Sequence, residues 1–371
     1  MNVLYLSTSM GAGHLKAAEA LKEYVDQRYP DSRSLIVDTF KYINPIVHKI
    51  IVDGYLSLIR SIPCIYGALY KMSERMENIN RLSNALSKVF SYKLLKLIKD
   101  FNPSIIVCTH PFPLQIVSCL KRDNKINIPA MGILTDYVNH PFWFHDNIEC
   151  YIVAHDKIKQ DMVNCGIPEN RIYTYGIPVS KDFLEKSPKE KLLKKYGLKD
   201  KLTVLIMGGS LGFGDIKKIF LAFLKSRGDI QLIVVTGKNE KLRRQLQSYI
   251  NPYNKNVLLM GYTNEVYNLM DIADLIFTKP GGMTISEALV KGLPIFIMSP
   301  IPGQEERNSY FLISNGAAEK IYTEKDVQNV INTILDNPHK LKSMKQKSKK
   351  LSIPNSGYKV VNLMESLIEN F

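Results

Sequence analysis

The residues best suited to bind a phosphorylated ligand lie between residues 276 and 308. A strand predicted over Ala273–Thr278 runs into Pro280-Gly281-Gly282, and a helix is predicted to begin directly afterwards. Glycines at a strand-to-helix turn let an anion approach the free N–H groups of the helix, because a side chain there would block it. Glu287 lies one turn into this helix, where its carboxylate can accept hydrogen bonds from the vicinal hydroxyls of a sugar. The stretch therefore predicts a site for a nucleotide, held by its diphosphate and its ribose.

A histidine in the first glycine turn is a second candidate for chemistry. Asn2–Ser7 is predicted as a buried strand, and His14 begins a helix whose apolar positions recur every three or four residues. The positive end of a helix disfavours an imidazolium, so a histidine there stays neutral and able to act as a base. The sequence GAGHLK matches neither the Walker loop nor GxGxxG. His14 is therefore either a general base or a simple cap of its helix.

Length and composition limit the classes of protein. The 371 residues favour two domains over one, and a hydrophobic content of 45% is enough for a core in each. Five scattered cysteines without a CxxC pair indicate a reducing compartment and argue against a zinc site. No apolar run is long enough for a transmembrane span, and the first residues do not predict a leader. A net charge of +14 reflects either a lysine-rich composition that aids solubility or an anionic partner. If there is a partner, the absence of a nucleic-acid-binding motif ranks a membrane above nucleic acid.

Strands and helices alternate in two series, which predicts two doubly wound α/β domains. We expect an N-terminal domain over residues 1–178, a lysine-rich linker over 179–201, a second domain over 202–350, and a C-terminal helix over 351–371 that packs back across the domains. In the second series, Gly208–Gly214 is predicted as a phosphate-type loop between a strand and the helix Ile216–Leu224. Further strands are predicted over Ser104–Cys108, Pro129–Leu134, Cys150–Ala154, Ile172–Tyr175, Leu202–Met207, Ile230–Thr236, Val257–Met260 and Pro294–Ser299.

Lys41–Phe101 interrupts the alternation with a basic amphipathic stretch, predicted to be continuously helical. It contains ten lysines and arginines against four acidic residues, and its apolar side chains recur at helical spacing. Such a stretch is typical of a helix that lies on an anionic bilayer. Helices that face the core and expose a solvated basic face would give the same pattern, so both interpretations stay open.

Polar and aromatic residues also follow the strand predicted over Pro129–Leu134. Asp136 lies just past its carboxyl end, where the catalytic groups of open α/β sheets gather, and His140 and Trp143, the single tryptophan, follow closely.

Four motifs together resemble a known family. They are GAGH at residues 11–14 followed by Ala17-Ala18-Glu19-Ala20, the set Thr135, Asp136, Tyr137, His140 and Trp143, the loop GGSLG at 208–212, and KPGGMTISEA with PGQEERN at 279–308. Over nearly the whole chain the sequence is similar to the inverting glycolipid glycosyltransferases of the monogalactosyldiacylglycerol synthase and processive diacylglycerol glucosyltransferase type, relatives of MurG. The resemblance implies a GT-B fold, in which two Rossmann-like domains face a central cleft.

The resemblance also implies roles for individual residues. His14 matches the acceptor-site histidine or general base, with Asp136 as the other catalytic candidate. Acceptor binding is implied for Gly13, His14, Tyr137, His140 and Trp143. Donor binding is implied for Gly209, Ser210, Gly261, Tyr262, Thr263, Lys279, Gly281, Gly282, Met283, Thr284, Glu287, Gln304 and Glu305. Within that set, residues 281–284 match the diphosphate turn, Glu287 the ribose carboxylate, residues 261–263 the uracil frame, and Gln304 and Glu305 the contacts to the hexose.

The activity implied is transfer of glucose or galactose from UDP-glucose or UDP-galactose to diacylglycerol. The family works as peripheral membrane enzymes, so we expect a place on the cytoplasmic face of the cell membrane, reached through Lys41–Phe101, and no nucleic acid partner. The chain has no DxD motif, and helix N-termini with glycine loops can stabilise the UDP leaving group, so no metal or cofactor is expected. The choice of sugar and repeated transfer stay open.

Three alternatives stand beside this hypothesis. One is a MurG-like N-acetylglucosaminyltransferase with a lipid-linked acceptor, which the long Lys41–Phe101 segment disfavours. Another is a UDP-N-acetylglucosamine 2-epimerase, which needs no lipid surface. The last is a nucleotide-sugar sensor without turnover, which the intact candidates for base, phosphate and ribose binding disfavour.

Overall fold

The computed structural model describes most of the chain. It covers residues 1–46, 48–50, 53–54, 57, 65–68, 70, 72, 79–226, 229–250 and 256–371, with the side chains of 79–89 and 338 left aside. The chain divides into two compact units. Unit 1 comprises Met1–Lys181, Ile301–Gln304 and Ile353–Phe371, and unit 2 comprises Asp182–Pro300 and Glu305–Ser352.

Unit 1 is built on a six-stranded parallel sheet with the order β2-β1-β3-β4-β5-β6. The strands are β1 (Asn2–Ser7), β2 (Arg33–Asp38), β3 (Ile105–Cys108), β4 (Ala130–Ile133), β5 (Cys150–Ile152) and β6 (Ile172–Tyr173). Its helices are α1 (Ala12–Arg28), α2 (Thr39–Ile43), α5 (Ile79–Phe101), α6 (Pro111–Arg122), α7 (Asp156–Asn164) and α16 (Ser356–Glu369). Strands β3 and β4 are buried along their whole length, as expected for parallel strands covered on both faces. Because all pairings are parallel, the carboxyl ends of β1, β3 and β4 meet at one edge.

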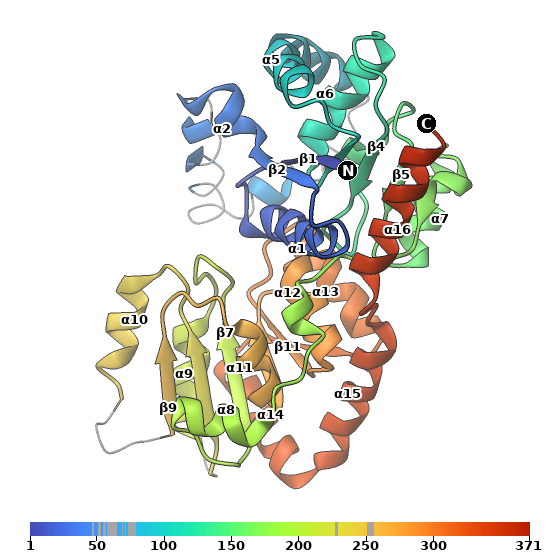
Figure 1. The fold of residues 1–371 in the computed structure, drawn as a ribbon. Coiled ribbons are helices and arrows are strands. Elements are labelled where there is room, and N and C mark those ends of the chain that lie inside the picture. Colours follow the sequence, from blue (N-terminus) through green and yellow to red (C-terminus); the bar gives the residue numbers. More distant parts are fainter. Residues whose placement is uncertain are drawn as a thin grey trace. The chain divides into compact units, whose positions relative to one another are not determined.

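Unit 2 repeats this plan with a six-stranded sheet of order β12-β11-β10-β7-β8-β9. Its strands are β7 (Thr203–Met207), β8 (Gln231–Val235), β9 (Val257–Met260), β10 (Leu275–Thr278), β11 (Ile295–Met298) and β12 (Ala318–Ile321). Its helices are α8 (Lys189–Tyr196), α9 (Ile216–Leu224), α10 (Glu240–Gln247), α11 (Val266–Ile272), α12 (Gly282–Lys291), α13 (Gln304–Ser314), α14 (Glu324–Asp336) and α15 (Pro338–Leu351). The prediction of two doubly wound α/β halves is confirmed (Figure 1).

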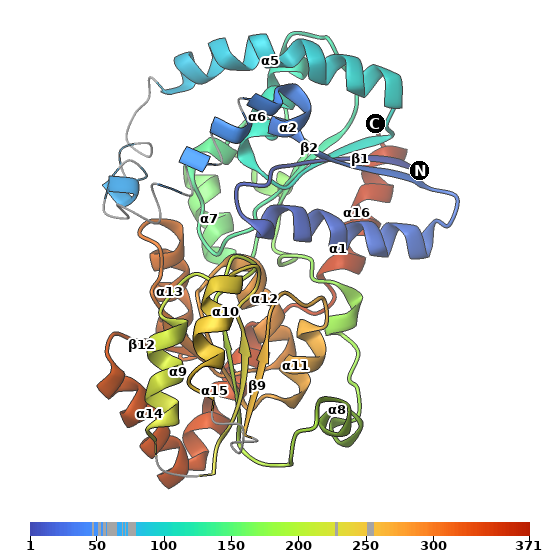
Figure 2. The same ribbon diagram turned by 90° about the vertical axis from the view of Figure 1, so that its left-hand side faces the viewer.

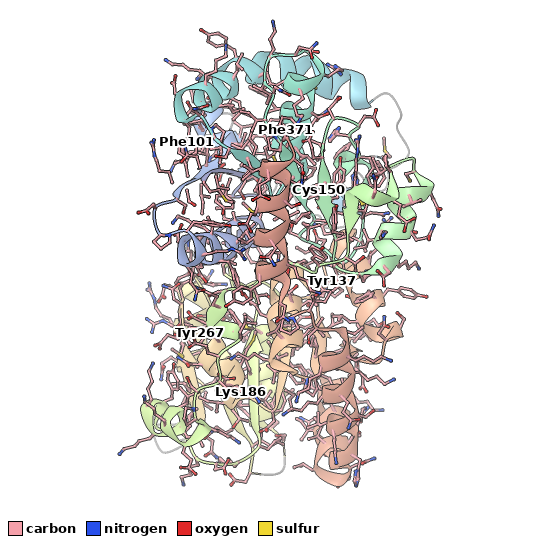
Figure 3. All side chains as sticks on the ribbon, turned by 45° about the vertical axis from the view of Figure 1, so that its right-hand side comes forward. Phe101, Tyr137, Cys150, Lys186, Tyr267 and Phe371 are labelled. Atoms are coloured by element: carbon pink, nitrogen blue, oxygen red, sulfur yellow. The ribbon has the colours of Figure 1, made fainter. Side chains whose placement is uncertain are left out.

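The C-terminal helix α16 belongs to unit 1 and lies beside α1 (Figure 1). The ring of Tyr24 covers Gly357, where an added Cβ would lie 2.2 Å from a ring carbon. Arg28 of α1 binds Glu365 of α16 at 2.7 Å. Phe371 follows this helix (Figure 3), and the ammonium group of Lys121 lies 4.9 Å from its ring centre.

The buried ammonium group of Lys291 links the first segment of unit 2 to helices α11 and α12. The Lys291 ammonium contacts the Asp271 carboxylate at 2.9 Å, with the two side chains 3% and 7% exposed. It also donates to the Glu185 carbonyl at 2.7 Å. Helix α8 follows within residues 182–300 of unit 2.

The predicted helical stretch Lys41–Phe101 is seen in part. Helix α2 covers its start, and α5 runs along its end as one long helix (Figure 2). Residues 47, 51–52, 55–56, 58–64, 69, 71 and 73–78 of this prediction lie outside the described residues. Among the helices that the structure describes, none combines the length and apolar character needed to cross a membrane.

Candidate active site

In unit 1 the strand ends place two oxygen atoms against His14, in the first turn of α1. His14 Nδ1 lies 2.8 Å from the Thr109 carbonyl oxygen and 2.7 Å from Thr135 Oγ1. A carbonyl oxygen can only accept a hydrogen bond, so Nδ1 carries the proton and donates to it. In this neutral tautomer Nε2 keeps its lone pair. The geometry thus gives the ring one nitrogen atom fixed by the protein and one able to take a proton.

The surroundings keep His14 neutral. Burial lowers its pKa to about 4, against a smaller opposing effect of the hydrogen bond to Thr109. The ring of His110 stands edge-on to it, with centroids 4.7 Å apart and an interplanar angle of 82°. Burial, and then the nearby His14, lower the pKa of His110 well below its usual range. His110 Nδ1 accepts the Phe112 N–H, which caps helix α6. Two neutral imidazoles therefore pack together at this edge.

Three residues of this cluster were not predicted as site residues. Thr109 acts through its backbone, which residue type cannot reveal. Thr135 belongs to the motif at residues 135–143, but the family resemblance assigned it no role. His110 lies two residues past the strand predicted over Ser104–Cys108, and that position was the one available signal.

The remaining acceptor candidates occupy the segment after β4. Asp136 is half-buried and directly follows Thr135, which joins this segment to His14. Tyr137 and Trp143 are each only 6% exposed, so their rings belong to the packed interior of the unit. His140 Nδ1 accepts the Phe142 N–H at 3.3 Å and caps the short helix Pro141–Trp143. Gly13, in the first turn of α1, stays a predicted acceptor contact.

In unit 2 the backbone of the predicted phosphate-type loop 208–214 packs closely against other backbone atoms. A Cβ on Gly212 would lie 2.0 Å from the Thr236 carbonyl oxygen, and one on Gly208 would lie 2.1 Å from the Phe213 carbonyl oxygen. The loop is tied to the next strand end by the Lys238 N–H, which donates to the Ser210 carbonyl at 2.9 Å. Gly209 differs, because a Cβ there would meet nothing within 4 Å. Gly208 and Gly212 thus serve packing, whereas Gly209 leaves open backbone next to Ser210.

Helix α12 presents the predicted diphosphate turn. Its N-cap is Gly281, which supplies no side-chain cap, and a Cβ on Gly281 would meet nothing within 4 Å. The first N–H groups of this helix are therefore left for an anion. Within the helix Met283 is buried, and Thr284 and Glu287 are half-buried.

Two contacts brace this turn. The Asn308 side chain, fully buried in α13, donates to the Pro280 carbonyl at 3.0 Å. The Lys279 ammonium pairs with Glu305 at 3.0 Å, with the side chains 11% and 12% exposed. Lys279 thus neutralises Glu305 beside the turn. Gln304, the first residue of α13, accepts a hydrogen bond from the Tyr66 hydroxyl at 2.9 Å within unit 1.

The predicted uracil frame follows strand β9. The Tyr262 side chain is 48% exposed, and the Lys238 ammonium lies 5.6 Å from its ring centre. An exposed ring of this kind can stack on a base. Gly261 and Thr263 flank it, and the Thr263 hydroxyl accepts the Glu265 N–H at 3.0 Å. Among the described residues, no three His, Cys, Asp or Glu side chains gather in a group that could hold a metal ion.

Comparison with known proteins adds the family. The Monogalactosyldiacylglycerol (MGDG) synthase family matches residues 14–179, and the Glycosyltransferase family 28 C-terminal domain matches residues 203–358. The processive diacylglycerol beta-glucosyltransferase of Bacillus pumilus is 31% identical over 99% of this chain and 94% of its own length. The protein of the same name from Bacillus subtilis is 30% identical over 95% of this chain and 92% of its own length.

Solved structures share the fold at low identity. The S. aureus MnaA–UDP co-structure has a TM-score of 0.63 at 12% identity, over 100% of this chain and 97% of that one. Acinetobacter baumannii MurG has a TM-score of 0.60 at 15% identity, over 98% of this chain and 99% of that one. These likenesses and the two parallel sheets confirm the predicted GT-B fold class. By sequence over nearly its whole length, the chain belongs to the family of the processive diacylglycerol beta-glucosyltransferases.

Proposed function

We propose that the chain transfers a hexose, glucose or galactose, from a UDP-sugar to the primary hydroxyl of diacylglycerol, with inversion at the anomeric carbon. The observation that carries this proposal is the neutral His14, whose Nδ1 proton is held by the Thr109 carbonyl and whose Nε2 is left as a base. The acceptor class is supported by the names of the relatives, which are diacylglycerol glucosyltransferases. The donor class is supported by the open N-terminus of α12 and by an Anabaena HepE structure of similar fold in complex with UDP-glucose.

The transfer proceeds as a single displacement. His14 Nε2 takes the proton of the acceptor hydroxyl while the oxygen forms a bond to the anomeric carbon. The bond from that carbon to the UDP oxygen breaks, and UDP leaves with the electron pair. The imidazolium formed in this step still donates through Nδ1 to Thr109. A positioned base of this kind contributes about 10²- to 10⁴-fold to a rate.

The charge that grows on UDP meets the N-terminus of α12. Preorganised N–H groups stabilise developing negative charge without the reorganisation that water would need. We therefore expect transfer without a metal ion, and activity should persist in EDTA. Activity below about a tenth of the untreated level, restored by added Mg²⁺ or Mn²⁺, would contradict this part of the proposal.

Unit 1 also carries a surface suited to an anionic bilayer. Tyr42, Ile46 and Ile50 are 42%, 71% and 68% exposed, and the exposed Lys41 and Lys49 directly precede Tyr42 and Ile50. Apolar side chains can enter the headgroup region while lysines pair with anionic lipids. We propose that this surface holds the protein on the cytoplasmic face of the membrane. Ile46→Asp should reduce co-sedimentation with vesicles containing phosphatidylglycerol, whereas Ile313→Asp, at an apolar residue of unit 2 that is 39% exposed, should not.

The decisive experiment offers purified protein diacylglycerol in anionic mixed micelles, with UDP-glucose and UDP-galactose in separate reactions. Mass spectrometry of the lipid should show a hexosyl-diacylglycerol from one donor, and the number of hexoses added shows whether transfer repeats. UDP-sugar binding without a lipid product from either donor would contradict the proposal and favour a nucleotide-sugar sensor.

A further inference from the structure

We propose that Thr135 is a positioning residue for His14. Its hydroxyl, together with the Thr109 carbonyl, fixes the ring orientation and the tautomer in which Nε2 is the base. This inference rests on the proposed role of His14 in sugar transfer. It goes beyond that role because it names the side chain on which the base depends.

The hydrogen-bond geometry allows one arrangement of protons. Both oxygen atoms lie within 2.8 Å of the same nitrogen, His14 Nδ1. If Nδ1 carried a lone pair, that lone pair would face the Thr109 carbonyl oxygen, which cannot donate. The Nδ1–H is therefore shared between the carbonyl and Thr135 Oγ1. Two acceptors for one N–H restrict the orientation of the imidazole ring more than a single acceptor does.

Both oxygens belong to residues that lie just past strand ends of the sheet. Thr109 follows β3, where its N–H donates to the Leu6 carbonyl at 3.1 Å and its own hydroxyl donates to Ser7 Oγ at 2.9 Å. Thr135 follows β4, where the preceding Leu134 N–H donates to the Ile152 carbonyl at 3.0 Å. Thr135 is only 4% exposed, so little water competes for its hydroxyl. Backbone hydrogen bonds to neighbouring strands thus anchor both segments close to His14.

The two oxygens that hold His14 Nδ1 carry no full charge, which distinguishes them from the carboxylate of a serine protease. In serine proteases a buried aspartate orients the histidine and stabilises the imidazolium. The two oxygens at His14 orient the ring without a full negative charge, so the resting ring stays neutral. Once Nε2 takes the acceptor proton, Nδ1–H becomes part of a cation and its hydrogen bonds strengthen. Thr135 thus contributes more to the transition state than to the resting enzyme.

The test removes only this hydroxyl. Thr135→Val keeps the shape of the side chain, and we expect kcat about tenfold lower, the effect of one lost hydrogen bond. Binding of the UDP-sugar, measured by calorimetry, should not change, and Thr135→Ser should recover most of kcat. Thr8→Val is the matched control, since Thr8 is also fully buried and its hydroxyl has no partner in the described part of the chain. That variant should stay within about twofold of wild type.

A second measurement does not depend on turnover or on the stability of a variant. The ¹⁵N spectrum of histidine-labelled wild-type protein, with His14 identified by its loss in His14→Gln, should show Nδ1 protonated and Nε2 bare. A protonated Nε2 with a bare Nδ1, or a Thr135→Val enzyme with wild-type kcat, would overturn the proposal. If the wild-type protein makes no glycolipid, the proposed function fails, whereas the spectrum still decides how His14 is held.

Discussion

Two glycine turns, each after the first strand of its unit, look alike in sequence and differ in structure. Gly11 has a φ of 95°, and a Cβ added to it would meet nothing within 4 Å. Gly212 has a φ of 62°, and its Cβ would lie 2.0 Å from a backbone oxygen. The turn in unit 1 needs glycine for its torsion angle alone and delivers a side chain, His14. The loop in unit 2 needs glycine for close packing and delivers backbone. The candidate site in unit 1 thus depends on individual side chains, and the candidate site in unit 2 depends on its backbone conformation.

The largest expected effect tests whether the site in unit 1 depends on one side chain, His14. His14→Ala should lower kcat by about 10²- to 10⁴-fold, because the base is lost. UDP-sugar affinity, measured by calorimetry, should be unchanged. His339→Ala, at an exposed histidine of unit 2, is the control and should keep full activity. Near wild-type turnover of His14→Ala would move the base role to Asp136.

Gly212→Ala tests whether the loop in unit 2 depends on close packing of its backbone. The added methyl group must displace the Thr236 carbonyl, and alanine is strained at this φ, so we expect a loss of about 3 kcal/mol or more in the free energy of unfolding. Gly11→Ala meets only the torsional cost of its backbone conformation, φ 95° and ψ 141°, about 1–3 kcal/mol. Urea unfolding of both variants measures the difference. Equal losses would show that the two turns do not differ as described.

A smaller effect is expected where a side chain of unit 2 supports its backbone. Asn308→Ala removes the donor to the Pro280 carbonyl and leaves that oxygen buried without this partner. Affinity for UDP should fall by about tenfold, in line with roughly 1–3 kcal/mol for such a loss. Calorimetric titration with UDP measures it. Unchanged affinity would mean that the turn before α12 keeps its shape without Asn308.

The smallest effect concerns pH. Because the pKa of His14 is about 4, its neutral form dominates down to about pH 5, where about a tenth of the rings are protonated. Activity should therefore stay nearly flat from pH 8 to 6 and fall below 5, while UDP binding should not follow this titration. The unfolded state, with an ordinary histidine pKa near 6.5, binds more protons in this window, so stability falls as the pH drops from about 6.5 toward 4. Melting temperatures at each pH separate the two effects. A loss of activity with an apparent pKa near 6.5 would contradict the assignment of His14 as a buried, neutral base.

The sequence predicts the regular elements best where apolar runs end in glycine or polar turns. Strands β1 and β9 and helix α9 have the predicted bounds, and the other predicted strands are one or two residues shorter at their ends. Strand β2 was not predicted, because it begins with Arg33 and Ser34 at the sheet edge and its apolar run spans only three residues, 35–37. Helix α14 was also not predicted, although its capping box of Thr323 and Asp326 was a usable signal.

For the candidate site, sequence supplies residue types and not partners. The position of His14 after the first strand is visible in the sequence, as are the glycines before α12. Its contacts to Thr109 and Thr135 are separated by 95 and 121 residues, and one of them is a backbone oxygen. The pairing of Lys279 with Glu305 is equally hidden, since each residue alone suggests a ligand contact. Only the folded sheet brings these groups together.

Because α16 packs in unit 1, it determines when that unit can finish folding during synthesis on the ribosome. Most of unit 1 emerges before unit 2, yet unit 1 includes Ile353–Phe371, which emerge after all of unit 2. Until then the Tyr24 face of α1 lacks the helix that covers it. The unit that starts first is therefore completed last, and its uncovered apolar face is exposed to aggregation or chaperones for as long as unit 2 is being translated.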